Sequence, residues 1–293
     1  MLCDIARVSL SGFYAWKKRK KEGMLRENRE HEDMKQIETL ISRWKRKWGY
    51  RTITMKLSRH DSGLQDPKPM NHKKVLRLMK KYNFLSKVRR QNPYKHIQKA
   101  TQEHSVAPNL LNRDFQCHIQ EWWLPYTKLW TDITYIRFNH RWVYFSLVKD
   151  MVTGEGLSYI LSMTLELTIV QNTYNNLKTT YTNNELSWAI SHSDQGFHYT
   201  HPSFSNILTQ IWLVQSMSRK WNCIDNAPTE SFFGHMKDEL DYAHCSSFAE
   251  LQEYFDQYMY YYNYERPQWI RKKMTPVQYR NHLLEISQQK HIV

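Results

Sequence analysis

Three acidic residues have the positions and the chemistry of a metal-binding site for phosphoryl transfer. Asp132 lies inside a run of β-branched and aromatic residues, where a carboxylate is costly unless it is paired or binds a metal ion. Asp194 ends a later predicted strand, and Glu230 lies in the first turn of a predicted helix that contains Pro228. Strand ends in open α/β sheets are common ligand sites, so the three side chains are candidates for one site.

The chemistry expected of such a site follows from its oxygen ligands. Carboxylates favour Mg²⁺ or Mn²⁺ over zinc, and two such ions about 4 Å apart activate a water or hydroxyl and stabilise the leaving oxygen. Lys237 follows Glu230 by seven residues, close to two helical turns, so both side chains share one helix face. A lysine there can hold a DNA phosphate beside the metal ions.

Each of these residues also has a purely structural explanation. An acid in a first helical turn is favoured by the helix dipole, and Asp194 stands before Gln195-Gly196 as turn residues often do. Lys237 fits an exposed helix surface equally well, and convergence in space is not visible in a sequence. A zinc site is a weaker alternative, because the spacing of its candidates fits no standard pattern: His192, His198, His201 and Cys223.

The elements that would position the acids form a mixed α/β pattern. Two runs rich in β-formers, 129–138 and 141–151, are separated by Asn139-His140 and predict a β-hairpin. Further strands are expected at 156–163, 187–194 and 213–218, with helices at 166–182, 201–212, 226–242 and 248–264. Strands followed by alternating helices and strands indicate a mixed sheet flanked by helices. We place this domain at 124–284, followed by a tail at 285–293.

The basic residues are concentrated in the first part of the chain. The 293 residues suggest about two domains. Residues 1–120 hold 28 Lys and Arg against 11 Asp and Glu, a net charge of +17, whereas residues 121–293 hold 14 against 17, a net charge of −3. Such asymmetry predicts a polyanion-binding module joined to a nearly neutral domain, although a basic soluble surface would give the same composition.

The basic part of the sequence predicts a small all-helical module of the helix-turn-helix type. Residues 1–26 predict two short helices around a turn near Val8-Ser9, with Ser9 or Ser11 as a cap, and then a basic run at 17–21. Residues 27–86 predict three helices, the last capped by Asn71 with Val75, Leu76 and Met79 facing inward. A basic last helix can enter the DNA major groove, although an ordinary basic surface helix is the alternative. The residues expected at DNA are Arg51, Lys73, Lys74, Arg77, Lys80 and Lys81.

Other classes of protein are disfavoured. Residues 87–123 lack periodicity and are expected to form a basic linker along DNA phosphates. The chain has neither a run of about 18 apolar residues nor the apolar core of a secretory signal, so we expect no membrane partner. Four cysteines far apart in the chain argue against a disulfide framework and favour the cytoplasm.

The acidic motifs resemble those of DDE transposases, most closely the second-frame product of the insertion-sequence-three family, which is related to retroviral integrases. Thirty-five residues separate Asp194 from Glu230, as in that family, and Lys237 matches its basic residue seven positions after the glutamate. The resemblance covers nearly the whole chain and rests on several segments in order: Gly49-Tyr50-Arg51, 71–79, 130–135, 192–196, 225–233, 262–267 and Met274-Thr275-Pro276.

The resemblance implies an RNase H-like catalytic core in which Asp132, Asp194 and Glu230 hold two Mg²⁺ or Mn²⁺ ions. It implies cutting of DNA at the terminal inverted repeats of an insertion sequence and attack of the freed 3′-hydroxyl on target DNA. It further implies a homo-oligomer on DNA and an upstream first-frame product, fused to the chain or paired with it. The chain departs from the family at Trp221, where a small residue is usual. That departure leaves open a non-catalytic DNA-binding regulator or a decayed relic.

Overall fold

The computed structural model describes residues 9–44, 47–59, 62–86, 107–111, 124–218 and 227–290, with the backbone alone for 227–230 and 290. The chain divides into two compact units, Met1–Val88 and Arg89–Val293, which are described separately. Within the described ranges no helix has the length and apolar character needed to cross a membrane.

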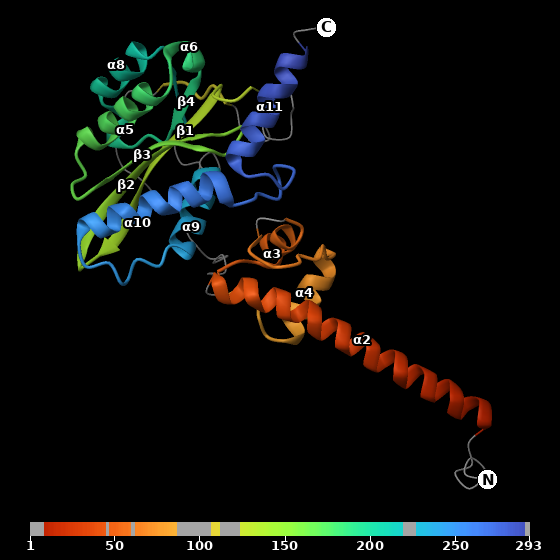
Figure 1. Ribbon diagram of the computed structural model, residues 1–293. Coiled ribbons are helices and arrows are strands. Elements are labelled where there is room, and N and C mark those ends of the chain that lie inside the picture. Colours follow the sequence, from red (N-terminus) through yellow and green to blue (C-terminus); the bar gives the residue numbers. More distant parts are fainter. Residues whose placement is uncertain are drawn as a thin grey trace. The chain divides into compact units, whose positions relative to one another are not determined.

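The first unit is helical, as the sequence predicts, and consists of α2 (Leu10–Arg43), α3 (Tyr50–Leu57) and α4 (His72–Lys81) (Figure 1). Ser9 caps α2 by accepting a hydrogen bond from the Gly12 backbone N–H at 3.1 Å, and Asn71 caps α4 by accepting from Lys73 N–H at 2.8 Å. Both capping predictions are therefore confirmed.

Helix α2 corrects the predicted division of this region. The helix runs without a break from Leu10 to Arg43, so the boundary expected between residues 26 and 27 falls inside it. The basic run at 17–21 is composed of good helix formers, which extend the amphipathic stretch that follows instead of ending a separate helix. The first of the two short helices expected here lies largely outside the described residues, as does most of the linker expected at 87–123.

The core of the first unit is formed where the three helices meet. Helix α4 contributes Val75, Leu78 and Met79, all fully buried, whereas Leu76 is only half-buried. The prediction that Leu76 faces inward was wrong, because positions i, i+3 and i+4 share a helix face and Leu76 is turned about 100° from Val75. The remaining buried apolar residues of the three helices are Met34, Ile37, Leu40, Ile41, Ile53, Met55 and Leu57.

Acidic residues of α2 hold the basic helix α4. The Glu30 side chain is 11% exposed and accepts hydrogen bonds from Arg77 at 2.6 Å and Lys81 at 3.0 Å. Asp33 forms an ion pair with Lys74 at 2.5 Å. The hydrogen bonds from Arg77 and Lys81 lower the pKa of Glu30 from 4.5 to about 2. Three of the basic residues predicted to contact DNA therefore also attach α4 to α2.

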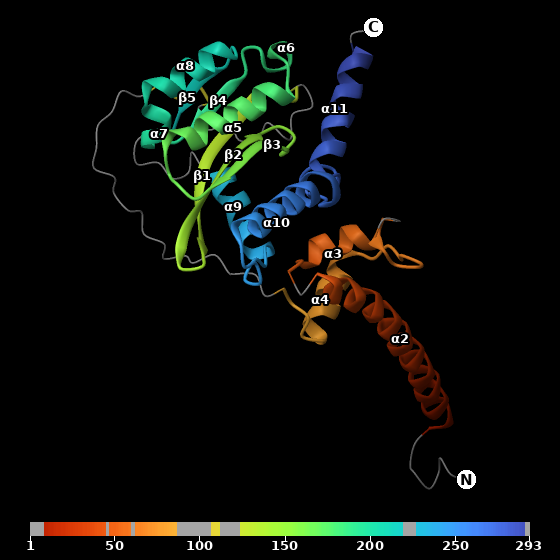
Figure 2. The ribbon, with the colours of Figure 1, turned by 60° about the vertical axis from the view of Figure 1, so that its left-hand side comes forward.

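The second unit contains a five-stranded mixed sheet in the order β3-β2-β1-β4-β5 (Figure 2). The strands are β1 (Lys128–Phe138), β2 (Arg141–Asp150), β3 (Gly156–Ser162), β4 (Ile190–Ser193) and β5 (Val214–Met217). Strands β1, β2 and β3 are antiparallel neighbours, whereas β4 is parallel to both β1 and β5. The predicted hairpin is confirmed, and Asn139 and His140 have the positive φ angles, 44° and 63°, that a tight two-residue turn requires.

Helices cover both faces of this sheet (Figures 1 and 2). On one face, α5 (Leu167–Thr180) and α8 (Pro202–Gln210) bury a core that includes Leu129, Val148 and Tyr174, and two short helices, α6 (Asn183–Leu186) and α7 (Phe197–Thr200), flank them. On the other face lie α9 (Ala227–Glu239) and α10 (Phe248–Tyr260), whose Phe233 and Phe255 contact Phe145 of β2. The predicted mixed sheet flanked by helices is confirmed.

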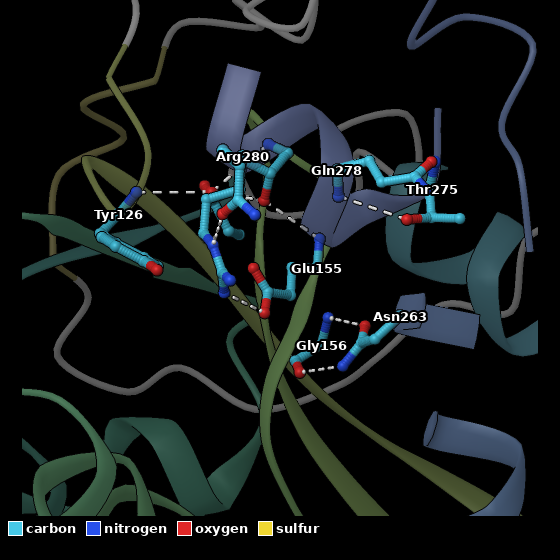
Figure 3. A network of polar contacts seen from close by, with 10 residues as sticks. Tyr126, Glu155, Gly156, Asn263, Thr275, Gln278 and Arg280 are labelled. Carbon is cyan, nitrogen blue, oxygen red and sulfur yellow. Dashed lines mark hydrogen bonds and ion pairs between the residues drawn. The ribbon is translucent and has the colours of Figure 1, made fainter. Parts of the chain in front are cut away.

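The C-terminal segment, η3 (Tyr261–Glu265) and α11 (Pro276–Lys290), is tied to the turn between β2 and β3 (Figure 3). The Asn263 amide accepts from Gly156 N–H and donates to Gly156 C=O, both at 2.9 Å. Arg280 of α11 forms an ion pair with the buried Glu155 at 2.6 Å. The tail predicted from residue 285 is corrected, because α11 continues through Lys290 on residues with no helix breaker.

The Glu30 contacts generate a stability prediction. Because the pKa of Glu30 is depressed in the folded state, its stabilising effect is complete above pH 4.5 and is lost as the pH falls towards about 2. We expect Glu30→Gln to lower the melting temperature at pH 7 and to flatten the acid dependence in that window. Thermal unfolding followed by circular dichroism measures both. Glu32→Gln, an exposed neighbour with the same charge change, is the control, and equal behaviour of the two variants would contradict a stabilising role for Glu30.

Candidate active site

The parallel pairing of β1 with β4 brings Asp132 and Asp194 to the same level of the sheet. The last paired residues of the two strands are Trp130 and His192, and each aspartate lies two residues beyond its member of that pair. Trp130 and His192 are also in ring contact, with centroids 6.2 Å apart. Two acids that are 62 positions apart in sequence therefore emerge together where β4 ends and β1 continues.

Two tyrosines, Tyr199 and Tyr135, lie within reach of the charges of both aspartates. Burial, and then the charges of Asp132 and Asp194, raise the pKa of the Tyr199 phenol well above its usual value. The Tyr199 hydroxyl lies 3.3 Å from Thr131 Oγ1, directly beside Asp132 in the chain. Burial also raises the pKa of Tyr135, and the charges of Tyr144, Asp194 and Asp132 add to this effect.

The two carboxylates differ in their surroundings. Burial raises the pKa of Asp194, and the hydrogen bond that its Oδ1 accepts from Gly196 N–H at 2.8 Å opposes that rise. Asp132 Oδ1 accepts from Ile133 N–H at 2.8 Å. A nearby cation would lower the cost of keeping both carboxylates ionised in these half-buried positions, so the donor set fits a hard divalent ion.

Helix α9 brings Glu230 to the face of the sheet on which Asp132 lies. Side chains alternate along a strand, so Asp132 shares its face with Thr134, whose partner across the hairpin is Phe145. Phe145 contacts Phe233 of α9 with ring centroids 6.3 Å apart, and α9 packs against β1. Glu230 lies one helical turn before Phe233, although only its backbone is described. The start of α9 therefore lies on the face of β1 that carries Asp132.

Residues that the sequence did not single out hold α9 in place. Lys149 of β2 lies over the rings of Phe232 and Tyr262, at 5.0 Å and 5.6 Å from their centroids, and these two rings are 4.7 Å apart. Burial lowers the pKa of Lys149. A lysine within an apolar strand was a signal for such a role, but its partners come from segments far away in sequence.

The other end of α9 is held by a buried ion pair. Both oxygens of Glu239 accept hydrogen bonds from Arg266, the shortest at 2.6 Å, and the two side chains are 8% and 14% exposed. Arg266 follows η3, so the C-terminal segment fixes the end of the helix that begins near Glu230. Lys237 is exposed on α9, seven residues after Glu230.

The alternative zinc ligands do not come together among the described side chains. His192 Nδ1 lies 2.9 Å from Ser216 Oγ, and His201 Nδ1 accepts from Ser203 N–H. His198 Nε2 lies 3.4 Å from the Leu165 carbonyl, a different partner again. No group of three His, Cys, Asp or Glu forms a metal cluster in the described part, from which Cys223, Trp221 and the Glu230 side chain are missing.

The residues predicted to contact DNA separate into two groups in the first unit. Lys73, Arg77 and Lys80 are exposed and lie on one face of α4, at positions i, i+4 and i+7. Lys74 and Lys81 point towards the acids of α2, and Arg77 contributes to both groups. Arg51 is exposed on α3, with its Nε donating to the Tyr50 hydroxyl at 3.2 Å.

Comparison with known families matches both units. The HTH-like domain family matches residues 27–92, and the integrase core domain family matches residues 230–284. A putative transposase InsK of insertion element IS150 from Escherichia coli K12 is 35% identical over 250 residues, covering 84% of this chain and 82% of that protein. Transposase InsF of IS3A from the same strain is 27% identical over 243 residues, covering 81% and 77%.

Two further similarities accompany these. An uncharacterised transposase-like protein of Haemophilus influenzae is 34% identical over 222 residues, which cover 75% of this chain and 98% of that one. Among solved structures, the HTLV-2 integrase catalytic core domain in complex with magnesium aligns with a TM-score of 0.44 and 13% identity, covering 54% of this chain and 97% of the domain.

The pair of Glu239 and Arg266 generates a prediction about the second unit. Arg266→Met removes the cation that pairs with the buried Glu239 carboxylate, and breaking a buried ion pair in this way typically costs about 3–5 kcal/mol of unfolding free energy. We expect a loss of this size in urea unfolding, with partial recovery in the double variant Glu239→Met/Arg266→Met. Lys178→Met removes an exposed charge from α5 and serves as the control. A loss for Arg266→Met no larger than that of the control would refute the anchoring role.

Proposed function

Because the chain belongs to the IS3-like family of insertion-sequence transposases, we propose that it cuts DNA at the ends of such an element in a metal-dependent reaction and joins the freed ends to target DNA. The observation that supports this proposal most is the register of β1 and β4, in which Asp132 and Asp194 each follow the last paired residues, Trp130 and His192, by two positions. The packing of α9 on the same face supports Glu230 as the third member.

In this proposal Asp132, Asp194 and Glu230 hold Mg²⁺ or Mn²⁺, two ions in all. When bound, these ions lower the pKa of the attacking water or 3′-hydroxyl and offset the charge on the leaving oxygen. With the ions bound, the three carboxylates would hold the site at which the scissile phosphate lies, and Lys237 would bind a neighbouring phosphate oxygen. Attack on phosphorus expels the 3′-oxygen of the bond that breaks, and no covalent intermediate with the protein forms.

We assign DNA binding chiefly to the first unit. The HTH-like domain family covers it, and the exposed face of α4 carries Lys73, Arg77 and Lys80. Terminal inverted repeats and target DNA are the proposed partners, with a homo-oligomer holding two ends and an upstream first-frame product fused or paired with the chain. Action on bacterial DNA would place the protein in the cytoplasm, at the nucleoid.

The alternative function, DNA binding without catalysis, differs in one measurable respect. We expect the full chain to nick a supercoiled plasmid that carries both element ends when Mg²⁺ or Mn²⁺ is added. Glu230→Gln and Asp132→Asn should each reduce nicking by more than the ~100-fold loss typical of an outer-shell metal partner, because they remove a ligand itself. DNA affinity in a gel-shift assay should change little.

Glu253→Gln, an exposed acid on α10, is the control for the loss of one negative charge. Wild-type binding without nicking in either metal would favour a regulator or relic. Nicking that persists unchanged in both acid variants would refute the assigned site.

The division of basic residues on α4 generates a prediction about DNA affinity. Lys73→Ala and Lys80→Ala should each weaken binding and reduce the slope of log affinity against log salt by about one. Lys74→Ala should reduce that slope less, because Asp33 already neutralises this lysine. Fluorescence anisotropy over a range of salt concentrations measures the slopes. Equal slopes for all three variants would mean that the α2 acids do not divide the helix into two groups.

A further inference from the structure

Three aromatic residues, two of them exposed and Tyr144 half-buried, cluster on one face of the β1–β2 hairpin. The hairpin patch consists of Tyr135 and Arg137 on β1 and Trp142 and Tyr144 on β2. The Tyr135 ring lies 6.2 Å from Trp142 and 5.2 Å from Tyr144 between centroids, and Arg137 lies over Trp142 at 5.2 Å. Tyr135 is 49% exposed and Trp142 is 50% exposed, so the clustered rings present a large surface to solvent.

The patch lies on the part of the sheet that extends past the candidate active site. Strand β1 runs parallel to β4, which ends at Ser193, whereas β1 continues to Phe138. Beyond Trp130 the edge of β1 has no further strand partner on that side in the described part of the chain. Tyr135 lies three residues after Asp132, and the charges of both aspartates reach its phenol. Because side chains alternate along β1, the hairpin patch lies on the face of the sheet opposite Asp132. A strand of DNA at the carboxylates would therefore pass around this open edge to reach the patch.

The charge of the hairpin fits a nucleic-acid partner. Between Ile133 and Val148 the chain carries Arg137, His140 and Arg141 and no acidic residue. The surrounding region 121–293 has a net charge of −3, so the hairpin is a local basic surface on an otherwise slightly acidic part of the chain. Aromatic rings beside basic side chains bind single-stranded nucleic acid, because every base has a face that can stack.

Other exposed tryptophans of this unit have a different location. Trp188 precedes β4 and Trp212 precedes β5, and Trp188 N–H donates to the Trp212 carbonyl at 2.9 Å. Both lie at the starts of these parallel strands, at the end of the sheet opposite Asp194. Trp188 and Trp212 are thus as exposed as the rings of the hairpin patch, but only the patch lies near the carboxylates.

We propose that the hairpin patch binds unpaired bases of the DNA strand whose phosphate lies at Asp132 and Asp194, by stacking on Trp142 and Tyr135. This inference rests on the proposed function, since it takes DNA at the carboxylates as given. Unpairing near the scissile phosphate frees a strand to reach the site, and stacking on the patch would hold its bases apart from the complementary strand.

The test compares two DNA probes with the full chain. One is a blunt duplex of an element end, and the other carries a short single-stranded 3′ extension that contains 2-aminopurine, whose fluorescence responds to stacking. We expect wild-type protein to prefer the extended probe and to change its fluorescence. Trp142→Ala should weaken binding to that probe by about 10-fold, with little change for the blunt duplex. Trp142→Phe should retain most of the preference, and Trp212→Ala should resemble wild type.

Tyr135→Ala supplies an independent variant, and circular dichroism checks folding of each protein. Wild-type affinities and fluorescence in Trp142→Ala and Tyr135→Ala would overturn the proposal. It would also be overturned if Trp142→Ala changed the oligomeric state and left probe binding intact, since the patch would then contact a second copy. The assigned acids are tested separately by Asp132→Asn, which should bind both probes like wild type but not nick DNA. Failure of the stacking proposal would therefore leave the assignment of the acids untouched, and the reverse also holds.

Discussion

The parallel pairing of β1 and β4 is the interaction on which the candidate site depends. Two carboxylates at the same level of adjacent strands repel each other, and burial makes the charged form of Asp194 less favourable. The sheet holds them there because Leu129 and Val148 on its other face pack into the core beneath α5 and α8. The free energy gained by packing that core offsets the cost of holding the two carboxylates close together. A cation bound between them would lower this cost.

A second constraint comes from the end of the chain. Helix α9 lies on the sheet through Phe232 and Phe233, but its far end is fixed by Arg266, and α11 is fixed to the β2–β3 turn by Arg280. Both contacts are ion pairs with little exposure, so removing one partner of either pair would leave a buried charge without its counter-ion. The position of Glu230 therefore depends on segments that begin more than 30 residues after it.

Local signals in the sequence were sufficient for elements but not for their assembly. Alternation and a two-residue turn predict the β1–β2 hairpin, and Asn71 marks the start of α4, because both signals involve neighbours in the chain. The common level of Asp132 and Asp194 depends on the register between β1 and β4. Because β2, β3 and α5 separate these two strands in the chain, no local sequence pattern predicts that register. The partners of Lys149 were missed for the same reason, whereas Trp221 lies outside the described residues.

Charge counting alone overstates the surface that α4 can present to DNA. The helix carries five basic residues of Lys and Arg type, yet three of them form ion pairs with Glu30 and Asp33 of α2. Arg77 shows the consequence most clearly: it is exposed on the face of Lys73 and Lys80, but a phosphate that bound it would compete with Glu30. The hydrogen bonds from Arg77 and Lys81 hold the pKa of Glu30 well below its ordinary value, so giving up the Arg77 bond to a phosphate costs free energy. Lys73 and Lys80 can therefore bind DNA without weakening the packing of α4 on α2.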